Sequence, residues 1–376
     1  MSPLPVQRLL NSKHPRQQKG VAVMIPSAIE QAFGRPYELS DYRLLAGGLS
    51  GARVYHACGP GSSTQGSRVQ QTDGYVLRCW PSQVTQRRVD HIHQVIGSAA
   101  EHCAFLLKPL PVGAACSDHR SVFGHQLTSM RDDNGRIWEL NRCLPGRPLA
   151  LDADVEQICQ GVSALADVHQ SLRRQGNSQA FAESITERTR RIAQLTTQLP
   201  SIWGLPLQGR ISPRVVDQLV RVQTLLRAKW GGFAGEMSIQ LGKLAARRLP
   251  VHFVLRDTRR QHALFDQGKV SGIIDYDALR VDFPAVDLAR WVSGFALYQS
   301  QRQEILKAVV AEYNEKTTFP SVYPVEELTR AIELIAESSQ MISLANWLVW
   351  LAAERRQFED WSAVSARLNE LLSLVD

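Results

Sequence analysis

One short stretch of strand-forming residues interrupts the helical second half of this chain, and it carries two aspartates. Val251–Leu255, Ala263–Phe265 and Val270–Asp275 have the composition of strands, whereas the flanking sequence has helical spacing. Asp257 follows the first strand, and Asp275 ends the third, 18 residues later. We expect these strand ends to converge. Because two neighbouring carboxylates repel one another unless a cation lies between them, a divalent metal ion carrying a nucleotide's phosphates is the expected ligand.

The rest of the chain divides into a strand-rich part and a helical part. Residues 40 to 140 contain one helix, Gln86–Ala100, and residues 141 to 376 are mainly helical, as in Asp154–Arg173, Pro213–Trp230 and Ile239–Arg248. Residues 1 to 39 are basic and contain proline, so we expect an N-terminal extension that is partly ordered at best. The expected strands of the first part are Tyr42–Leu45, Arg53–Cys58, Tyr75–Trp80, Gln126–Met130 and Arg136–Leu140.

Size and composition support two lobes and exclude several classes of protein. With 376 residues, of which 44% are hydrophobic, the chain can bury a sizeable core. The net charge of +7 is a mild excess that suits an anionic ligand such as ATP or has no specific meaning. No apolar run has the length of a membrane span or signal peptide, and no basic face interleaved with aromatics indicates nucleic-acid binding. The six cysteines form no C-x-x-C pair, so a reducing cytoplasm is the simplest compartment.

The residues around the two aspartates follow an ordered series of motifs. Leu255-Arg256-Asp257 is followed by His262, then by Ile274-Asp275, and then by Asp282-Phe283-Pro284 and Asp287-Leu288-Ala289. This series resembles the catalytic and metal-binding loops of the aminoglycoside phosphotransferase and choline kinase superfamily, relatives of protein kinases. That family has His-Gly-Asp, an Asn five residues after the Asp, Ile-Asp, and Asp-Pro-x-x-Asp-Leu-Ala. Here Leu255 and Arg256 replace the family's His and Gly, and His262 replaces its Asn.

The resemblance continues upstream, so that it covers roughly residues 40 to 300 in the family's order. Gly47-Gly48-Leu49-Ser50-Gly51 resembles the Gly-rich nucleotide loop, and Val76-Leu77-Arg78 resembles the strand of the phosphate-binding Lys, with Arg in its place. The segment around Glu139 and Leu140 resembles the hinge, and Ala164–His169 resembles the helix with the Ala-Leu-Ala-x-Leu-His motif. The resemblance implies an α+β, protein kinase-like fold with two lobes. The N-lobe is a small antiparallel sheet at residues 40 to 140, and the C-lobe is mostly helical at 141 to 376.

The resemblance also implies roles for the residues near Asp257. Asp257 orients or deprotonates the attacking hydroxyl, unless it only caps local N–H groups. Arg259, or its neighbour Arg260, neutralises charge on the moving phosphoryl group or belongs to a solvated pair. Asp275 binds Mg²⁺, whereas His262 either binds a softer ion such as Mn²⁺ or hydrogen-bonds the loop. Asp277 is a second metal candidate, and Asp287 and His169 are structural in this interpretation.

The implied cofactor is ATP between the two lobes. Arg78 has no obvious glutamate partner in the following helix, which leaves the family's ion pair without an assigned acid. The residues expected to bind the nucleotide are Gly47, Gly48, Ser50, Gly51, Arg78, Glu139 and Leu140.

Two functions follow from this series of motifs. The first is an ATP-dependent phosphotransferase that moves the γ-phosphate to a hydroxyl of a small molecule. The second is a nucleotide-binding pseudokinase that acts as a regulator or scaffold, which the departures at Arg78, Leu255, Arg256 and His262 favour. The acceptor pocket is expected among the C-terminal helices. Their glutamates either suit a cationic acceptor or are solvated, and they are Glu333, Glu337, Glu354 and Glu359.

Overall fold

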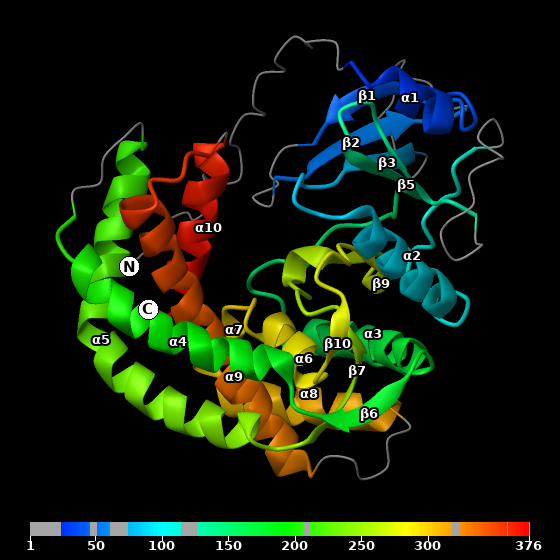
Figure 1. The fold of residues 1–376 in the computed structure, drawn as a ribbon. Coiled ribbons are helices and arrows are strands. Elements are labelled where there is room, and N and C mark those ends of the chain that lie inside the picture. The colour runs from blue at the N-terminus through cyan, green and yellow to red at the C-terminus, as the bar shows by residue number, and fades with distance from the viewer. Residues whose placement is uncertain are drawn as a thin grey trace, which may run out of the picture.

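The computed structural model describes residues 24–45, 51–60, 74–113, 126–205, 211–317, 324–358 and 360–375, and it has two lobes (Figure 1). The small lobe is an antiparallel five-stranded sheet in the order β1-β2-β3-β5-β4, beside which lies helix α2, Gln86–Ala100. Its strands are β1 Ser40–Leu44, β2 Arg53–Cys58, β3 Gly74–Cys79, β4 Ser129–Arg131 and β5 Ile137–Arg142. The expected α+β fold with a small antiparallel lobe is therefore confirmed.

Part of the expected N-terminal extension contributes to the small lobe. Helix α1, Ser27–Ile29, continues into a π-helical turn, Glu30–Gly34. Ile29 and Phe33 are fully buried and share one hydrophobic cluster with Leu77 of β3. The apolar residues of this helical segment therefore belong to the core of the small lobe.

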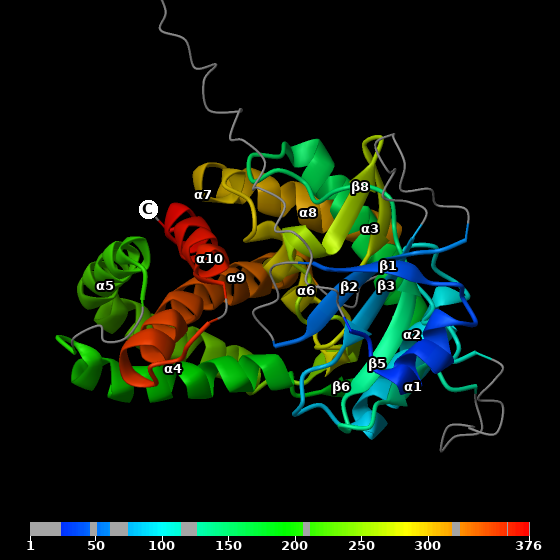
Figure 2. The same ribbon diagram turned by 90° about the horizontal axis from the view of Figure 1, so that it is seen from above.

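The large lobe is built from helices (Figure 2). Helix α5 packs against α4, α9 and α10, while α3 packs against α8, and α6 against α9. These helices are α3 Val155–Arg173, α4 Glu183–Ile202, α5 Pro213–Ala245, α6 Ala285–Val292, α7 Leu297–Ser300, α8 Arg302–Lys316, α9 Val325–Leu348 and α10 Trp361–Ser373, and a π-helical turn, Val349–Ala353, extends α9.

Helix α5 differs from the sequence prediction of two separate helices. Gly231, Gly232 and Gly235 lie in the interval between the two expected helices, and each lowers helix propensity by about 1 kcal/mol. The structure shows one continuous helix, because Leu226, Trp230 and other apolar residues along its whole length are buried against its neighbours. Tertiary packing therefore outweighs the local preference.

The strand-forming stretch of the second half forms two small sheets. The hairpin β8 Ala263–Asp266 and β9 Lys269–Ile273 is antiparallel, and the other sheet has the order β10-β7-β6. Its strands are β6 Asn177–Ala180, β7 Leu249–Val254 and β10 Arg280–Asp282. The expected strands match β7, β8 and β9, and together these strands place Asp257 and Asp275 in adjacent loops.

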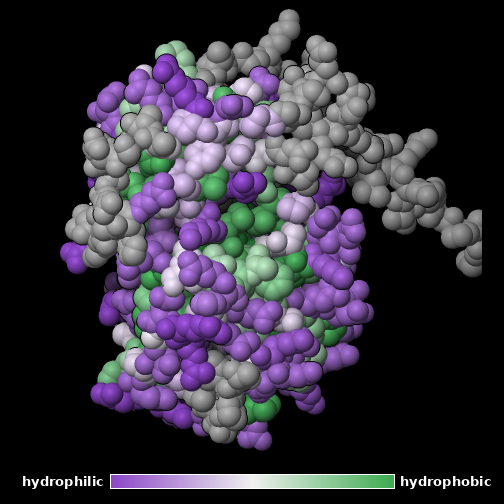
Figure 3. Space-filling model, turned by 90° about the vertical axis from the view of Figure 1, so that its right-hand side faces the viewer, coloured by the Kyte–Doolittle hydropathy of each residue, from purple (hydrophilic) through white to green (hydrophobic). Residues whose placement is uncertain are grey.

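The surface in Figure 3 is mostly hydrophilic, and hydrophobic residues gather near the centre of that face. Among the helices in the described ranges, none is long and apolar enough to cross a membrane. The five cysteines within these ranges are all free thiols: Cys58, Cys79, Cys103, Cys143 and Cys159.

Candidate active site

The loops that carry the two aspartates have an unusual backbone. Arg256 has φ +64° and Asp275 has φ +69°, in the left-handed region that residues with a Cβ rarely adopt. Such conformations cost about 1–3 kcal/mol each and gather at functional sites. At Arg256, where the resembled family has glycine, the side chain is anchored: its Nε lies 3.2 Å from Asp282 Oδ2, and it also pairs with Glu187.

A buried aspartate holds the strand end before Asp257. Asp287 is fully buried, and its Oδ2 accepts hydrogen bonds from Leu255 N at 2.8 Å and from His169 Nε2 at 3.0 Å. The other ring nitrogen of His169 contacts Tyr313 Oη at 2.9 Å. The side chains of Asp287 and His169 therefore form hydrogen bonds within the protein interior, which agrees with the structural roles expected for them.

Asp257 is held by two arginines at one oxygen. Its Oδ1 accepts hydrogen bonds from Arg259 Nε at 2.9 Å and from Arg290 Nη2 at 2.6 Å and Nε at 3.2 Å. Burial alone would raise the pKa of this carboxyl, but Arg290 and Arg259, together with His262, hold the pKa well below its usual range. Asp257 is consequently an anion at every physiological pH.

His262 joins the two aspartate loops. Its Nδ1 lies 2.7 Å from the carbonyl oxygen of Asp257, so Nδ1 is the donor, and its Nε2 lies 3.5 Å from Asp275 Oδ2. Burial lowers the pKa of His262 despite the neighbouring carboxylates of Asp275 and Asp257. The neutral ring then turns a lone pair toward a carboxylate oxygen. A cation between these two acceptors would relieve their repulsion, but within the described residues no three or more His, Cys, Asp or Glu side chains gather as a metal site.

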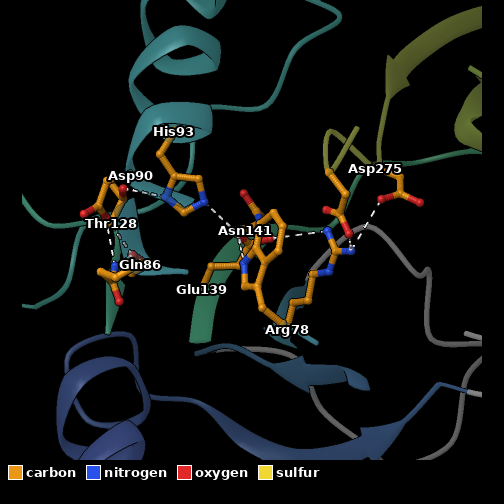
Figure 4. A network of polar contacts seen from close by, with 11 residues as sticks. Arg78, Gln86, Asp90, His93, Thr128, Glu139, Asn141 and Asp275 are labelled. Atoms are coloured by element: carbon orange, nitrogen blue, oxygen red, sulfur yellow. Dashed lines mark hydrogen bonds and ion pairs between the residues drawn. The ribbon is translucent and has the colours of Figure 1, made fainter. Parts of the chain in front are cut away.

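Arg78 reaches Asp275 from the small lobe (Figure 4). Its Nη2 lies 3.4 Å from Asp275 Oδ1 and also pairs with Asp277, while Nη1 lies 3.9 Å from Glu139 Oε1. Burial alone would lower the pKa of Arg78, but the carboxylates of Asp277, Glu139 and Asp275 raise it. Arg78 therefore links the sheet to the loop of Asp275.

Glu139 is the acid partner that the sequence left unassigned, and it comes from β5 instead of from α2. Its Oε2 accepts a hydrogen bond from Trp80 Nε1 at 2.7 Å and contacts His93 Nε2 of α2 at 2.6 Å (Figure 4). Helix α2 thus reaches Arg78 through the pair His93–Glu139. Leu140 is fully buried, and its carbonyl accepts from Leu110 N at 2.9 Å.

The expected glycine-rich loop is described only at its end. Gly47, Gly48 and Ser50 lie outside the described residues. Gly51 is exposed and has φ +81°, a conformation that requires glycine or strain.

A pocket lies beside the arginines that hold Asp257, between the loop that follows Asp257 and helices α6, α9 and α10. Its walls include Arg259, Arg290, Arg367, Gln261 and Glu370. Of the four glutamates expected near the acceptor, none in the described ranges lines this pocket: Glu333 and Glu337 lie near Arg302, Glu354 pairs with Arg356 at 2.6 Å, and Glu359 is outside those ranges.

Sequence reasoning missed three residues of this site: Arg290, Arg367 and His93. Arg290 directly follows the Asp287-Leu288-Ala289 motif, which was the one local signal for it. Arg367 and His93 are distant from the motifs along the chain, and they reach the site only through the packing of α10 and α2.

Comparison with known proteins agrees with this geometry. Residues 55–325 match the profile of the phosphotransferase enzyme family. The chain belongs to this family. Among proteins with curated descriptions, the sequence search found no significant match.

Solved structures of similar fold support the assignment of the fold. Spectinomycin phosphotransferase, solved with ADP and spectinomycin, is 10% identical with a TM-score of 0.58, and the match covers 93% of each chain. Amicoumacin kinase, solved with AMP-PNP, Ca²⁺ and Ami, is 14% identical with a TM-score of 0.52 over 88% of this chain and 87% of that one. An aminoglycoside phosphotransferase from Alicyclobacillus acidocaldarius is 13% identical with a TM-score of 0.51 over 95% and 97%.

Proposed function

We propose that this member of the phosphotransferase family transfers the γ-phosphate of ATP to a hydroxyl group of a small molecule. The observation that carries the proposal is the convergence of the two aspartate loops. His262 contacts the Asp257 carbonyl at 2.7 Å and faces the Asp275 carboxylate at 3.5 Å. The loops that carry the proposed catalytic and metal-binding aspartates are therefore neighbours, which suits phosphoryl transfer.

Asp257 orients the acceptor. All its hydrogen bonds from Arg259 and Arg290 go to Oδ1, so Oδ2 is the oxygen that accepts the hydrogen bond of the incoming hydroxyl. The hydroxyl oxygen forms a bond to the γ-phosphorus, the bond from that phosphorus to the β–γ bridging oxygen breaks, and ADP leaves with the electron pair. The hydroxyl proton passes to Asp257 and then to water. Because the pKa of Asp257 is held low, the carboxylate acts more by positioning than as a strong base.

Asp275 and His262 would hold the metal ion. An ion bound there would neutralise the phosphates; an imidazole ligand suits Mn²⁺ better than Mg²⁺, and both ions are proposed. Arg78 neutralises further phosphate charge, with its guanidinium oriented by Glu139. Arg259 lies beside Asp257 and is placed to neutralise charge on the moving phosphoryl group.

The test is a comparison of Asp257→Ala with the wild type at saturating ATP and either Mg²⁺ or Mn²⁺, over a panel of hydroxyl acceptors. The expected loss of kcat is about 10²- to 10⁴-fold, with unchanged affinity for an ATP analogue. Asp266→Ala is the matched control, because Asp266 is an exposed aspartate on β8. ATP binding without turnover of any acceptor would instead support a pseudokinase.

A further inference from the structure

The pocket next to the two arginines that hold Asp257 Oδ1 is lined by positive charge. Arg259, Arg290 and Arg367 form walls of the same pocket, and Glu370 is its one acidic lining residue in the described part of the chain. We propose that the acceptor is an anion, a hydroxyl compound that carries a carboxylate or a phosphate, and that Arg367 binds this group. The proposal rests on the phosphotransferase function proposed above and names its class of acceptor.

The acidic groups near the pocket are already bonded. Glu370 accepts from Arg367 Nη1 at 2.9 Å and from Gln261 Nε2 at 2.9 Å, and it lies 3.4 Å from Arg260 Nη2. Asp257 Oδ1 is shared between Arg259 and Arg290. Two carboxylates therefore face four guanidinium groups, and the balance is positive.

A fifth guanidinium lies behind the pocket wall. Arg188 Nη2 contacts Oγ of Ser339, a lining residue, at 3.2 Å. Burial, together with the charge of Arg290, lowers the pKa of Arg188 to about 10. Burial and the charges of Arg259 and Arg290 also lower the pKa of Arg367. These guanidinium groups destabilise one another's charge, and a bound anion would relieve that repulsion.

The shape of the pocket limits the size of the anionic group. The space that it encloses is about 20 Å³, which holds roughly one water molecule. A carboxylate or phosphate enters only if a side chain moves, and Arg259 is best suited, because it is 34% exposed. A shift of Arg259 opens the space beside Arg367, and arginine pairs with either anion in a two-point contact. The guanidinium groups would repel the ammonium group of a cationic acceptor.

A binding experiment on the whole protein tests the anion site. With the nucleotide site saturated by AMP-PNP and Mg²⁺, sulfate is titrated against chloride at equal ionic strength, and the rise in Tm is measured. We expect sulfate to stabilise the wild type saturably and Arg367→Gln to need roughly 10- to 100-fold more sulfate. Arg367→Lys should recover part of the response. Arg247→Gln is the matched control, because Arg247 is 52% exposed and pairs only with Glu327 in the described ranges.

A turnover experiment on the wild type tests the substrate class without any variant. Four three-carbon acceptors are compared for product formation: glycerate, glycerol 3-phosphate, glycerol and 3-amino-1,2-propanediol. The proposal expects the lowest KM for one of the two anions. It is overturned if the amino compound or glycerol has the lowest KM, in which case the phosphotransferase function stands.

The two proposals fail in different ways. An equal sulfate response in Arg367→Gln and the wild type overturns the anion site, whatever the turnover. A sulfate response that is lost only in Arg367→Gln supports the anion site. If, in that case, no ADP is formed from ATP with any of these acceptors or with water, the result counts against the phosphotransferase function alone.

Discussion

Replacement of Asp287 by alanine should destabilise the protein and also impair catalysis. Asp287 is fully buried, and its Oδ2 is the acceptor for both Leu255 N and His169 Nε2. Its removal leaves two buried donors without an acceptor, at about 1–3 kcal/mol each, or about 2–6 kcal/mol in total. A domain's stability is about 5–15 kcal/mol, so the variant should still fold at low temperature. The Leu255 N–H is two residues from Asp257, so the catalytic carboxylate should lose its position.

The matched control is Asp132→Ala in the small lobe. Asp132 is also buried, at 6% exposure, and it accepts from Asn134 N and Arg136 N at 2.9 Å and from Trp138 Nε1 at 3.0 Å. It lies in the β4–β5 turn, and its bonded partners are all within six residues along the chain. Its loss should therefore cost a similar free energy of unfolding without moving Asp257.

The assay combines urea denaturation with kcat for each variant at a temperature where both are folded. Asp287→Ala should lose at least about tenfold in kcat, and Asp132→Ala should keep the wild-type value. Equal kcat values for the two variants, at equal losses of stability, would refute the argument that Asp287 positions the catalytic loop.

Three further changes test other parts of the structure. Glu139→Ala removes one partner of a buried charge cluster and should cost about 3–5 kcal/mol in urea denaturation. Burial, which outweighs Arg78, raises the pKa of Asp277 to about 6 from 3.8, so the stability that the protonated carboxyl contributes is present below pH 4 and is lost as the pH rises to 6. Asp277→Asn should thus have a higher Tm than the wild type at pH 8, and not at pH 4. In Gly161→Ala the new Cβ would lie 2.0 Å from Cζ2 of Trp291, and the crowding should lower the unfolding free energy by about 1–3 kcal/mol.

The elements that the sequence predicted best are those with strong local patterns. Helix α2 has the predicted bounds, because Val89, Ile92 and Ile96 recur at helical spacing and all three are buried. Strands β6 and β10 were not predicted, because they are short and partly polar and form only by pairing with β7. Their existence depends on residues far away in the chain.

The candidate site divides in the same way. The loop spacing was sufficient to bring Asp257, Asp275 and His262 together, because one hairpin connects them. The contact between Glu139 and His93 could not be predicted without knowing how α2 packs on the sheet, because the two residues are 46 positions apart in the sequence. Local sequence patterns contain no information on such pairs.

Three of the four departures from the family pattern have side-chain partners, and this bears on the choice between enzyme and pseudokinase. Arg256 has a positive φ of +64°, a conformation that glycine adopts readily, and its side chain is anchored by Asp282. His262 keeps a loop hydrogen bond to the Asp257 carbonyl, and Arg78 keeps an acidic partner although that partner, Glu139, comes from β5. If the site had been released from selection for catalysis, there would be no physical reason for these three substitutions to retain the geometry around the two aspartates. The strained Arg256 costs stability, and a strained residue persists where the surrounding contacts maintain it for a function. These contacts therefore favour catalysis over a scaffolding role.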